Sequence, residues 1–285
     1  WNSGIVINHN KTTDHKTIFA GDGKIYQTVK QASHQSGNFY DSFAMRDPHF
    51  IEDGGKYYLI FEGNAGPDSG GEGISNFNNR AFYGTHNLIS FTKQRKALLK
   101  DKSSLEYTKT YYANAAVGKL ELNSDFTVKK IMKPIMTANG THDVVERPNL
   151  FEYKGKWYLF VDMTAGSFSS SDERFKSQSY MIGYVSNNGI NGKYHKLNGN
   201  GLVLSSSAAM GRNNYTYSFL ALKPSDNSKN IVVTSFDNNR TFAPSYLLRL
   251  NGDKSEILND RLLGQGALVD NGQYTKTVPQ SRFNG

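Results

Sequence analysis

The sequence contains no cysteine, which excludes disulfide bonds, thiol catalysis and thiolate metal sites from this chain of 285 residues. It also has no uninterrupted apolar run of 18 residues, so we expect a soluble protein that does not insert into a membrane. No hydrophobic segment begins the chain, so we expect any secretion signal to have been removed or left out. A cysteine-free composition rich in Asn, Ser, Lys and Tyr is typical of exported bacterial proteins, and we expect secretion, with the cell wall as one place of association.

The chain also lacks a Pro/Gly/Ser-rich linker and any abrupt shift of charge, so we expect one domain over residues 1–285. The net charge is +8 and the isoelectric point about 9.3, which is compatible with an anionic partner. The Lys and Arg residues are spread along the sequence, however, and no recognition helix accompanies them. We therefore expect no nucleic-acid partner.

Several catalytic motifs are missing as well. There is no His-Glu-x-x-His pair, no phosphate-binding Walker loop and no Gly-x-Ser-x-Gly nucleophile elbow. These absences argue against a zinc peptidase, a nucleotide hydrolase and a serine hydrolase.

Strand patterns dominate what is present. Short runs of β-branched and aromatic residues alternate with turns rich in Gly, Asn and Asp. Helical patterns are confined to segments such as residues 90–100. The predicted strands cover residues 57–62, 116–122, 157–162, 180–185, 231–236 and 245–250.

Residues 46–62 and 146–162 form an internal repeat, one hundred residues apart. Each copy opens with Arg-Asp-Pro or Glu-Arg-Pro, crosses a short strand, turns at Gly-Lys and enters an aromatic-rich strand. A fainter third copy covers residues 217–236. Such a repeat predicts the radially arranged sheets of a β-propeller, in which the inner strand of each blade reaches the axis. A β-sandwich is the alternative.

The repeat places two carboxylates, Asp47 and Glu146, at a shared location. Two acids in a polar pocket meet the needs of glycoside cleavage, in which one group protonates the leaving oxygen. Because side chains alternate along a strand, the neighbouring Arg need not be each acid's partner. Spacing alone leaves open the plainer interpretation that these acids are turn or surface residues.

Six longer strings occur in one order, at residues 44–49, 58–62, 81–84, 143–149, 180–186 and 241–248. Together they make the chain similar to the levansucrase and inulosucrase family, glycoside hydrolase family 68, from about residue 17 to residue 266. The resemblance implies an all-β, five-bladed β-propeller, of which this chain supplies roughly the last three blades. It also implies retaining transfer of a fructosyl group from sucrose to water, to sucrose or to a growing fructan or oligosaccharide acceptor.

The resemblance assigns roles to individual residues. Asp47 matches the acid that grips the fructosyl hydroxyls in the transition state, and Glu146 matches the general acid/base. Three further residues match positions that line the sugar pocket, namely Arg46, Tyr217 and Arg240. Glu62 matches a carboxylate that supports the pocket without touching the sugar.

A structural Ca²⁺ site is implied as well, and its oxygen ligands are of the kind that Ca²⁺ prefers. Glu72 stands where these enzymes commonly have Gln. The alternative is that the acidic and amide residues simply cap loops. The matched ligands are Asp41, Glu72, Asn114, Asp143 and the carbonyl of Tyr112.

The resemblance fails at the nucleophile. The family carries its attacking Asp in a Trp-Asp string well upstream of Arg-Asp-Pro, and here only about forty-five residues precede that motif. Trp1-Asn2-Ser3 is a coincidental match, and Asn cannot form the covalent intermediate. We therefore expect a propeller that is incomplete at its N-terminus, with the missing part as a partner.

Two further positions depart from the family pattern. Val144 stands where a Glu is usual and Thr164 where an Arg is usual, at positions that handle the glucosyl half of sucrose or the acceptor. Because both charges are absent together, no lone buried charge is left. We expect a weakened glucose subsite, with altered donor choice, more hydrolysis or shorter products.

The sequence thus favours a secreted fructansucrase-type glycoside hydrolase. The main alternative is a catalytically inactive propeller that binds sucrose or fructan without cleaving it, because the nucleophile is missing. A third candidate is another glycosidase of the same architecture, acting on arabinose- or xylose-containing chains.

Overall fold

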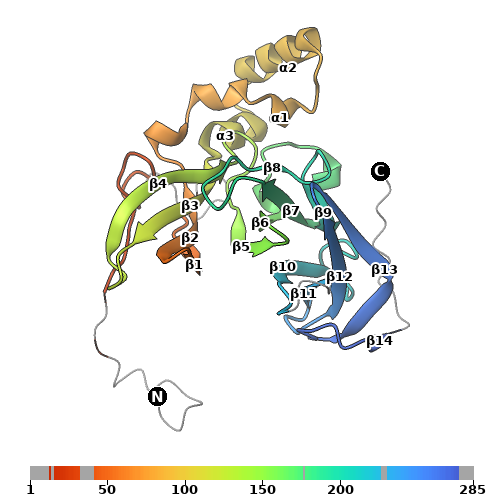
Figure 1. Ribbon diagram of the computed structural model, residues 1–285. Helices are drawn as coiled ribbons and strands as arrows, with labels where there is room; N and C mark the ends of the chain where they lie inside the picture. Colours follow the sequence, from red (N-terminus) through yellow and green to blue (C-terminus); the bar gives the residue numbers. More distant parts are fainter. Residues whose placement is uncertain (1–12, 14–15, 33–41, 176, 226–229, 276–285) are drawn as a thin grey trace.

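The computed structural model describes residues 13, 16–32, 42–175, 177–225 and 230–275. Three antiparallel sheets follow one another in chain order along an arc (Figure 1). Each sheet is one blade of a β-propeller, and its first strand lies innermost. The first strand of the middle blade contacts the first strands of both neighbours, so the β-sandwich alternative is wrong.

Blade 1 covers residues 46–137 and carries all of the α-helices within the described part of the chain. Helix α3 was not foreseen from the sequence. It begins after Ser104, whose side chain accepts a hydrogen bond from the Tyr107 N–H and thus caps the helix. The elements are β1 (Arg46–Asp53), β2 (Lys56–Asn64), η2 (Pro67–Ser69), η3 (Ile74–Asn78), α1 (Arg80–Tyr83), α2 (Leu88–Lys100), α3 (Leu105–Tyr112), β3 (Ala115–Leu122) and β4 (Val128–Thr137).

Blades 2 and 3 cover residues 146–205 and 216–275. All six strands predicted from the sequence are confirmed, and so is the predicted helix, which is α2. Among the described residues, no helix has the length and apolar character needed to cross a membrane. The elements are β5 (Glu146–Tyr153), β6 (Lys156–Thr164), η4 (Ala165–Ser167), η5 (Glu173–Phe175), β7 (Ser179–Ser186), β8 (His195–Lys196), β9 (Leu202–Ser205), β10 (Thr216–Leu222), β11 (Ile231–Asp237), β12 (Pro244–Asn251), β13 (Lys254–Gln265) and β14 (Tyr274–Thr275).

The core lies between neighbouring blades. One cluster joins blades 1 and 2 and includes Ile60 and Leu159, and a second joins blades 2 and 3 and includes Phe160 and Phe219. Leu159 and Phe160 are consecutive residues of β6, so their side chains point to opposite faces of the sheet. The middle blade is therefore buried on both faces, which explains its long apolar run.

Gly118 in β3 is required by close packing inside blade 1. A Cβ atom at this position would lie 2.2 Å from the Cζ atom of the Phe61 ring, on the neighbouring strand β2. Phe61 is only 4% exposed, so the ring has little room to move away.

We predict that Gly118→Ala lowers the free energy of unfolding by about 1–3 kcal/mol, because overpacking displaces a buried ring. Urea unfolding measures this change. Gly166→Ala is the matched control, since Gly166 has open space around it and no left-handed φ. Equal stability of the two variants would contradict the packing argument.

Candidate active site: carboxyl groups at the propeller axis

The three inner strands share one irregularity. Asp47 in β1, Arg147 in β5 and Ser218 in β10 have φ angles of 50°, 52° and 59°, and the strand register shifts at each of these positions. A bulge of this kind re-aims side chains and terminates regular pairing. Left-handed backbone is uncommon for residues other than glycine, so its recurrence at the same position of all three blades is a structural feature that the inner strands share.

The residue before each bulge faces a partner on the second strand of its blade. The chemistry differs between the blades: an ion pair in blade 1, two carboxyl groups in blade 2 and two aromatic rings in blade 3. One structural position therefore supplies three kinds of side chain to the axis. The cross-strand pairs are Arg46–Glu62, Glu146–Asp162 and Tyr217–Phe236.

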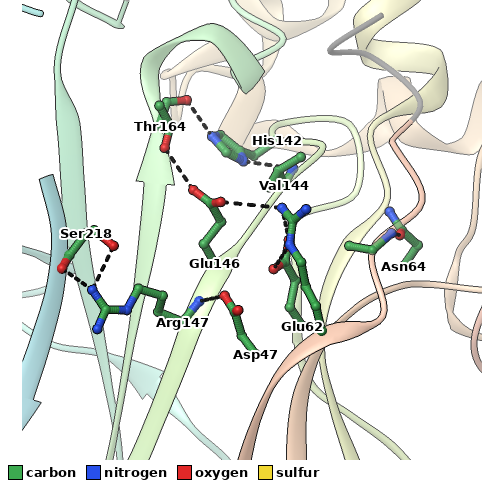
Figure 2. Close-up of polar contacts among 11 residues, drawn as sticks. Asp47, Glu62, Asn64, His142, Val144, Glu146, Arg147, Thr164 and Ser218 are labelled. Atoms are coloured by element: carbon green, nitrogen blue, oxygen red, sulfur yellow. Dashed lines mark hydrogen bonds and ion pairs between the residues drawn. The ribbon is translucent and has the colours of Figure 1, made fainter. Parts of the chain in front are cut away.

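Hydrogen bonds connect the three bulge residues across the blades (Figure 2). The Arg147 N–H donates to Asp47 Oδ2 at 2.9 Å, and Arg147 Nη1 donates to Ser218 Oγ at 2.7 Å and to the Ser218 carbonyl oxygen. The Asp47 carboxylate is thus bonded to the peptide unit that follows Glu146. The structure brings together the two acids that the sequence singled out.

Arg46 bridges blades 1 and 2. Its Nε and Nη2 atoms lie 2.7 and 3.1 Å from the two carboxylate oxygens of Glu62, and Nη2 lies 3.4 Å from Glu146 Oε1. Glu62 is fully buried, whereas the Arg46 side chain is 51% exposed. Burial raises the pKa of Glu62 to about 8, and the ion pair with Arg46 opposes that shift.

Glu146 is held on both oxygens. Oε1 faces Arg46, and Oε2 accepts a hydrogen bond of 3.1 Å from the Thr164 hydroxyl. Its side chain is 37% exposed, so solvent or a ligand can reach it. An accessible, oriented carboxyl group of this kind can donate and accept a proton.

Asp162 was missed by the sequence reasoning. It is 2% exposed, and within the described part of the chain neither carboxyl oxygen has a hydrogen-bond partner. Burial raises the pKa of Asp162 well above its ordinary value, and the Arg147 charge opposes this. The repeat itself could have revealed the residue, because Asp162 occupies the position that Glu62 has in blade 1.

The two remaining predicted pocket residues belong to blade 3. Tyr217 is half-buried and stacks on Tyr215, with ring centroids 5.5 Å apart. Arg240 is exposed in the turn between β11 and β12, where its N–H donates to the Asp237 carbonyl oxygen at 3.0 Å. Because Asp237 pairs with Thr216, this turn lies at the same end of the blade as Tyr217.

Val144 does not present a polar group to the site. Its side chain is 8% exposed, and its N–H donates to Nδ1 of the buried His142 at 3.2 Å. His142 was not singled out from the sequence. Burial lowers the pKa of this imidazole to about 4, so the ring is neutral near neutral pH.

Three of the expected calcium ligands lie close together. Asn114 Nδ2 donates to Glu72 Oε1 at 3.4 Å, and Asp143 Oδ2 accepts a hydrogen bond of 2.6 Å from the Ser42 N–H. Burial raises the pKa of Asp143 to about 7, and the charge of Glu72 adds to the shift.

Oxygen donors of this kind suit a hard cation, although Asn114 Oδ1 already accepts a hydrogen bond of 2.7 Å from Asn64 Nδ2. Among the described residues, the buried Asp143 Oδ1 has no hydrogen-bond partner, and a bound ion would supply one. No group of three or more His, Asp or Glu side chains among the described residues is arranged to hold a metal, so amide and carbonyl oxygens would be needed as well. Tyr112 ends α3, two residues before Asn114, and Asp41 lies outside the described residues.

The fold and the site define a β-propeller with acidic groups at its axis. Residues 4–268 match the levansucrase/invertase family model, so the chain belongs to this family, glycoside hydrolase family 68. This membership confirms the resemblance inferred from the sequence.

Individual relatives agree with the family match. The chain is 40% identical over 275 residues to a levansucrase of Bacillus subtilis and 39% identical over 275 residues to a protein of Geobacillus stearothermophilus named inactive levansucrase. Each alignment covers 93% of this chain and 56% of the relative. The chain thus spans just over half the length of these relatives.

A solved structure shows the same architecture. Bacillus subtilis levansucrase with two substitutions, in complex with oligosaccharides, superposes with a TM-score of 0.79 at 39% identity. The match covers 88% of this chain and 57% of that one.

We predict that Arg46→Ala lowers the free energy of unfolding by about 1–3 kcal/mol near pH 9, where the wild-type Glu62, with a folded pKa of about 8, is ionised and paired with Arg46. The loss is smaller near pH 5. There Glu62 is protonated in both proteins, because loss of Arg46 raises its folded pKa further, so no buried charge loses a partner.

Urea unfolding at both pH values measures this difference. Glu62→Gln and the double variant complete a mutant cycle and isolate the pairwise energy. Equal losses at the two pH values would contradict a role for the Glu62 charge.

Proposed function

We propose that this site transfers a fructosyl group from sucrose to water or to a sugar acceptor. The proposal is carried by the convergence of Asp47 and Glu146 in one hydrogen-bonded cluster at the propeller axis, with Glu146 open to solvent. Family membership supports the same chemistry.

In this proposal Glu146 protonates the glycosidic oxygen as glucose leaves and later removes a proton from the acceptor. Asp47 accepts hydrogen bonds from fructosyl hydroxyls and stabilises the positive charge that develops on the ring. Arg46 and Thr164 hold the Glu146 carboxyl group on its two oxygens. A retaining reaction also needs a nucleophilic carboxylate about 5 Å from the acid, and we assign that role to none of the described residues.

The glucose-binding side of the pocket is weak in this proposal. Val144 buries an apolar side chain, and the Thr164 hydroxyl is already bonded to Glu146. Neither residue offers a charged group to a glucosyl hydroxyl. We expect water to compete well with sugar acceptors.

We predict that the chain, assayed together with a polypeptide that supplies the nucleophilic carboxylate, releases glucose from sucrose, and that Glu146→Gln lowers kcat/KM by about 10²- to 10⁴-fold, because the proton donor is lost. Asp47→Asn lowers it to a similar degree. Glucose and fructose, measured separately, distinguish transfer from hydrolysis, since transfer leaves less free fructose than glucose.

Glu152→Gln is the matched control, since Glu152 lies on the same strand β5 and makes a partly exposed ion pair with Lys223. A wild-type protein that releases no glucose would refute the proposed activity. Full activity in Glu146→Gln would refute the role of that residue.

The second candidate is a propeller that binds sucrose or fructan without cleaving it. The observation favouring it is that one relative, 39% identical, is named an inactive levansucrase. Calorimetric binding of sucrose without any release of glucose would support this candidate. If Arg46→Ala abolishes this binding, the sucrose lies at the site formed by Arg46, Asp47 and Glu146.

We further propose that Glu72, Asn114 and Asp143, with the Tyr112 carbonyl and Asp41, hold a structural Ca²⁺ ion. The unpaired oxygen of Asp143 supports this proposal. Since Ser42 and Asp143 are hydrogen-bonded, an ion here would join the segments that lead into β1 and β5.

We predict that Ca²⁺ raises the melting temperature. An ion whose free concentration is about 100 times its Kd stabilises the folded state by about 2.7 kcal/mol. Removal of Ca²⁺ by a chelator reverses this rise. Mg²⁺ at the same concentration raises the melting temperature less, since Mg²⁺ favours smaller octahedral sites. Asp143→Asn abolishes the response. A response to Ca²⁺ that survives this substitution would place the ion elsewhere.

A further inference from the structure

Glu146 closes a ring of hydrogen bonds that returns to its own strand. Its Oε2 accepts from the Thr164 hydroxyl at 3.1 Å, and the Thr164 carbonyl oxygen lies 3.0 Å from His142 Nε2. His142 Nδ1 accepts from the Val144 N–H at 3.2 Å, and Val144 lies two residues before Glu146. Figure 2 shows the whole ring, in which only Thr164 comes from outside the segment that leads into β5.

The hydrogen bonds of this ring are compatible with only one tautomer of the His142 imidazole. Because the Val144 N–H can only donate, Nδ1 must be the unprotonated nitrogen, and Nε2 therefore carries the hydrogen donated to the Thr164 carbonyl oxygen. The imidazole is fully buried and packs edge-on against Phe168, with ring centroids 4.4 Å apart. His142 and Phe168 also form an isolated β-bridge. The histidine thus fixes the end of β6, where Thr164 lies.

The Thr164 hydroxyl suits a carboxyl group that changes its protonation state. A carboxylate can only accept a hydrogen bond, whereas a carboxylic acid can also donate one. A hydroxyl group donates in the first case and accepts in the second without movement of heavy atoms. Arg46, on the other oxygen of Glu146, can only donate. Thr164 is β-branched, so few rotamers compete with the one that points at Glu146.

We propose that Thr164 is a positioning residue that holds the Glu146 carboxyl group in one orientation through both halves of the reaction. His142 acts behind it by fixing the Thr164 backbone. The proposal rests on the proposed role of Glu146 as the acid/base. It differs from a substrate-binding role for Thr164, because the hydroxyl contacts the catalytic group.

The test compares Thr164→Val, which keeps the shape and removes the hydroxyl, with Thr164→Ser, which keeps the hydroxyl. We expect Thr164→Val to lower kcat for sucrose by about 10- to 100-fold, since small misplacements of a reacting group carry penalties of this size. KM should stay within about twofold. Thr164→Ser should recover most of the kcat. Loss of a sugar contact would instead raise KM, and a purely packing role would make Ser worse than Val.

Thr92→Val is the control for hydroxyl removal, because the Thr92 hydroxyl donates only within the exposed helix α2. If Thr164→Val does not fold, Thr164→Ala removes the same hydroxyl without adding a methyl group. A kcat equal to that of the wild type in the folded variant would overturn the proposal.

Crystal structures of the wild type, Thr164→Val and Thr164→Ser test the positioning independently of turnover. We expect the Glu146 carboxyl group to leave its orientation in the Val variant and to keep it in the Ser variant. An unmoved Glu146 in the Val variant would overturn the proposal even if the enzyme is active. A wild type inactive on sucrose would refute the proposed function alone, and the crystallographic comparison would still decide the role of Thr164.

Discussion

The hydrogen bond from the Arg147 N–H to the Asp47 carboxylate is the contact on which the site depends. It forms because both residues occupy left-handed bulges at equivalent positions of neighbouring inner strands, which turns a side chain of one blade toward the backbone of the next. The same Arg147 reaches Ser218 in the third blade. The bulge therefore does more than interrupt pairing: it converts three separate sheets into one arrangement of polar groups around an axis.

Burial decides how charge is distributed in this arrangement. Glu62 is fully buried and is matched by a two-point contact with Arg46, which also reaches Glu146. Asp162 occupies the equivalent position in blade 2, where no described residue is its hydrogen-bond partner, and burial favours its neutral form. Of these three acids, Glu146 is the one that combines exposure with fixed partners on both oxygens. A group that exchanges protons with a substrate needs both properties, because exposure gives access and fixed partners give orientation.

Much of the fold could be predicted from local pattern. The strands beginning near Tyr57 and Trp157 are rich in aromatic and aliphatic residues, and the hundred-residue repeat indicated equivalent blades. Helix α3 escaped notice because its sequence is polar and rich in Tyr and Thr, which are weak helix formers, and a single Ser104 cap marks its start. Asp162 was not recognised as a site residue because the motifs of the repeat drew attention to Glu146. Asp162, the cross-strand partner of Glu146, lies sixteen residues further along the chain.

The sequence by itself determined the family, the blade repeat and the pairing of Asp47 with Glu146 as candidate acids, because short motifs in a fixed order carry that information. Only the tertiary structure decided which groups those acids contact. Thr164 lies eighteen residues from Glu146 in the sequence and twenty-two from His142. The fold nevertheless places its hydroxyl 3.1 Å from Glu146 Oε2 and its carbonyl oxygen 3.0 Å from His142 Nε2. Hydrogen bonds act over such short distances that sequence spacing cannot specify them, and packing of the blades does.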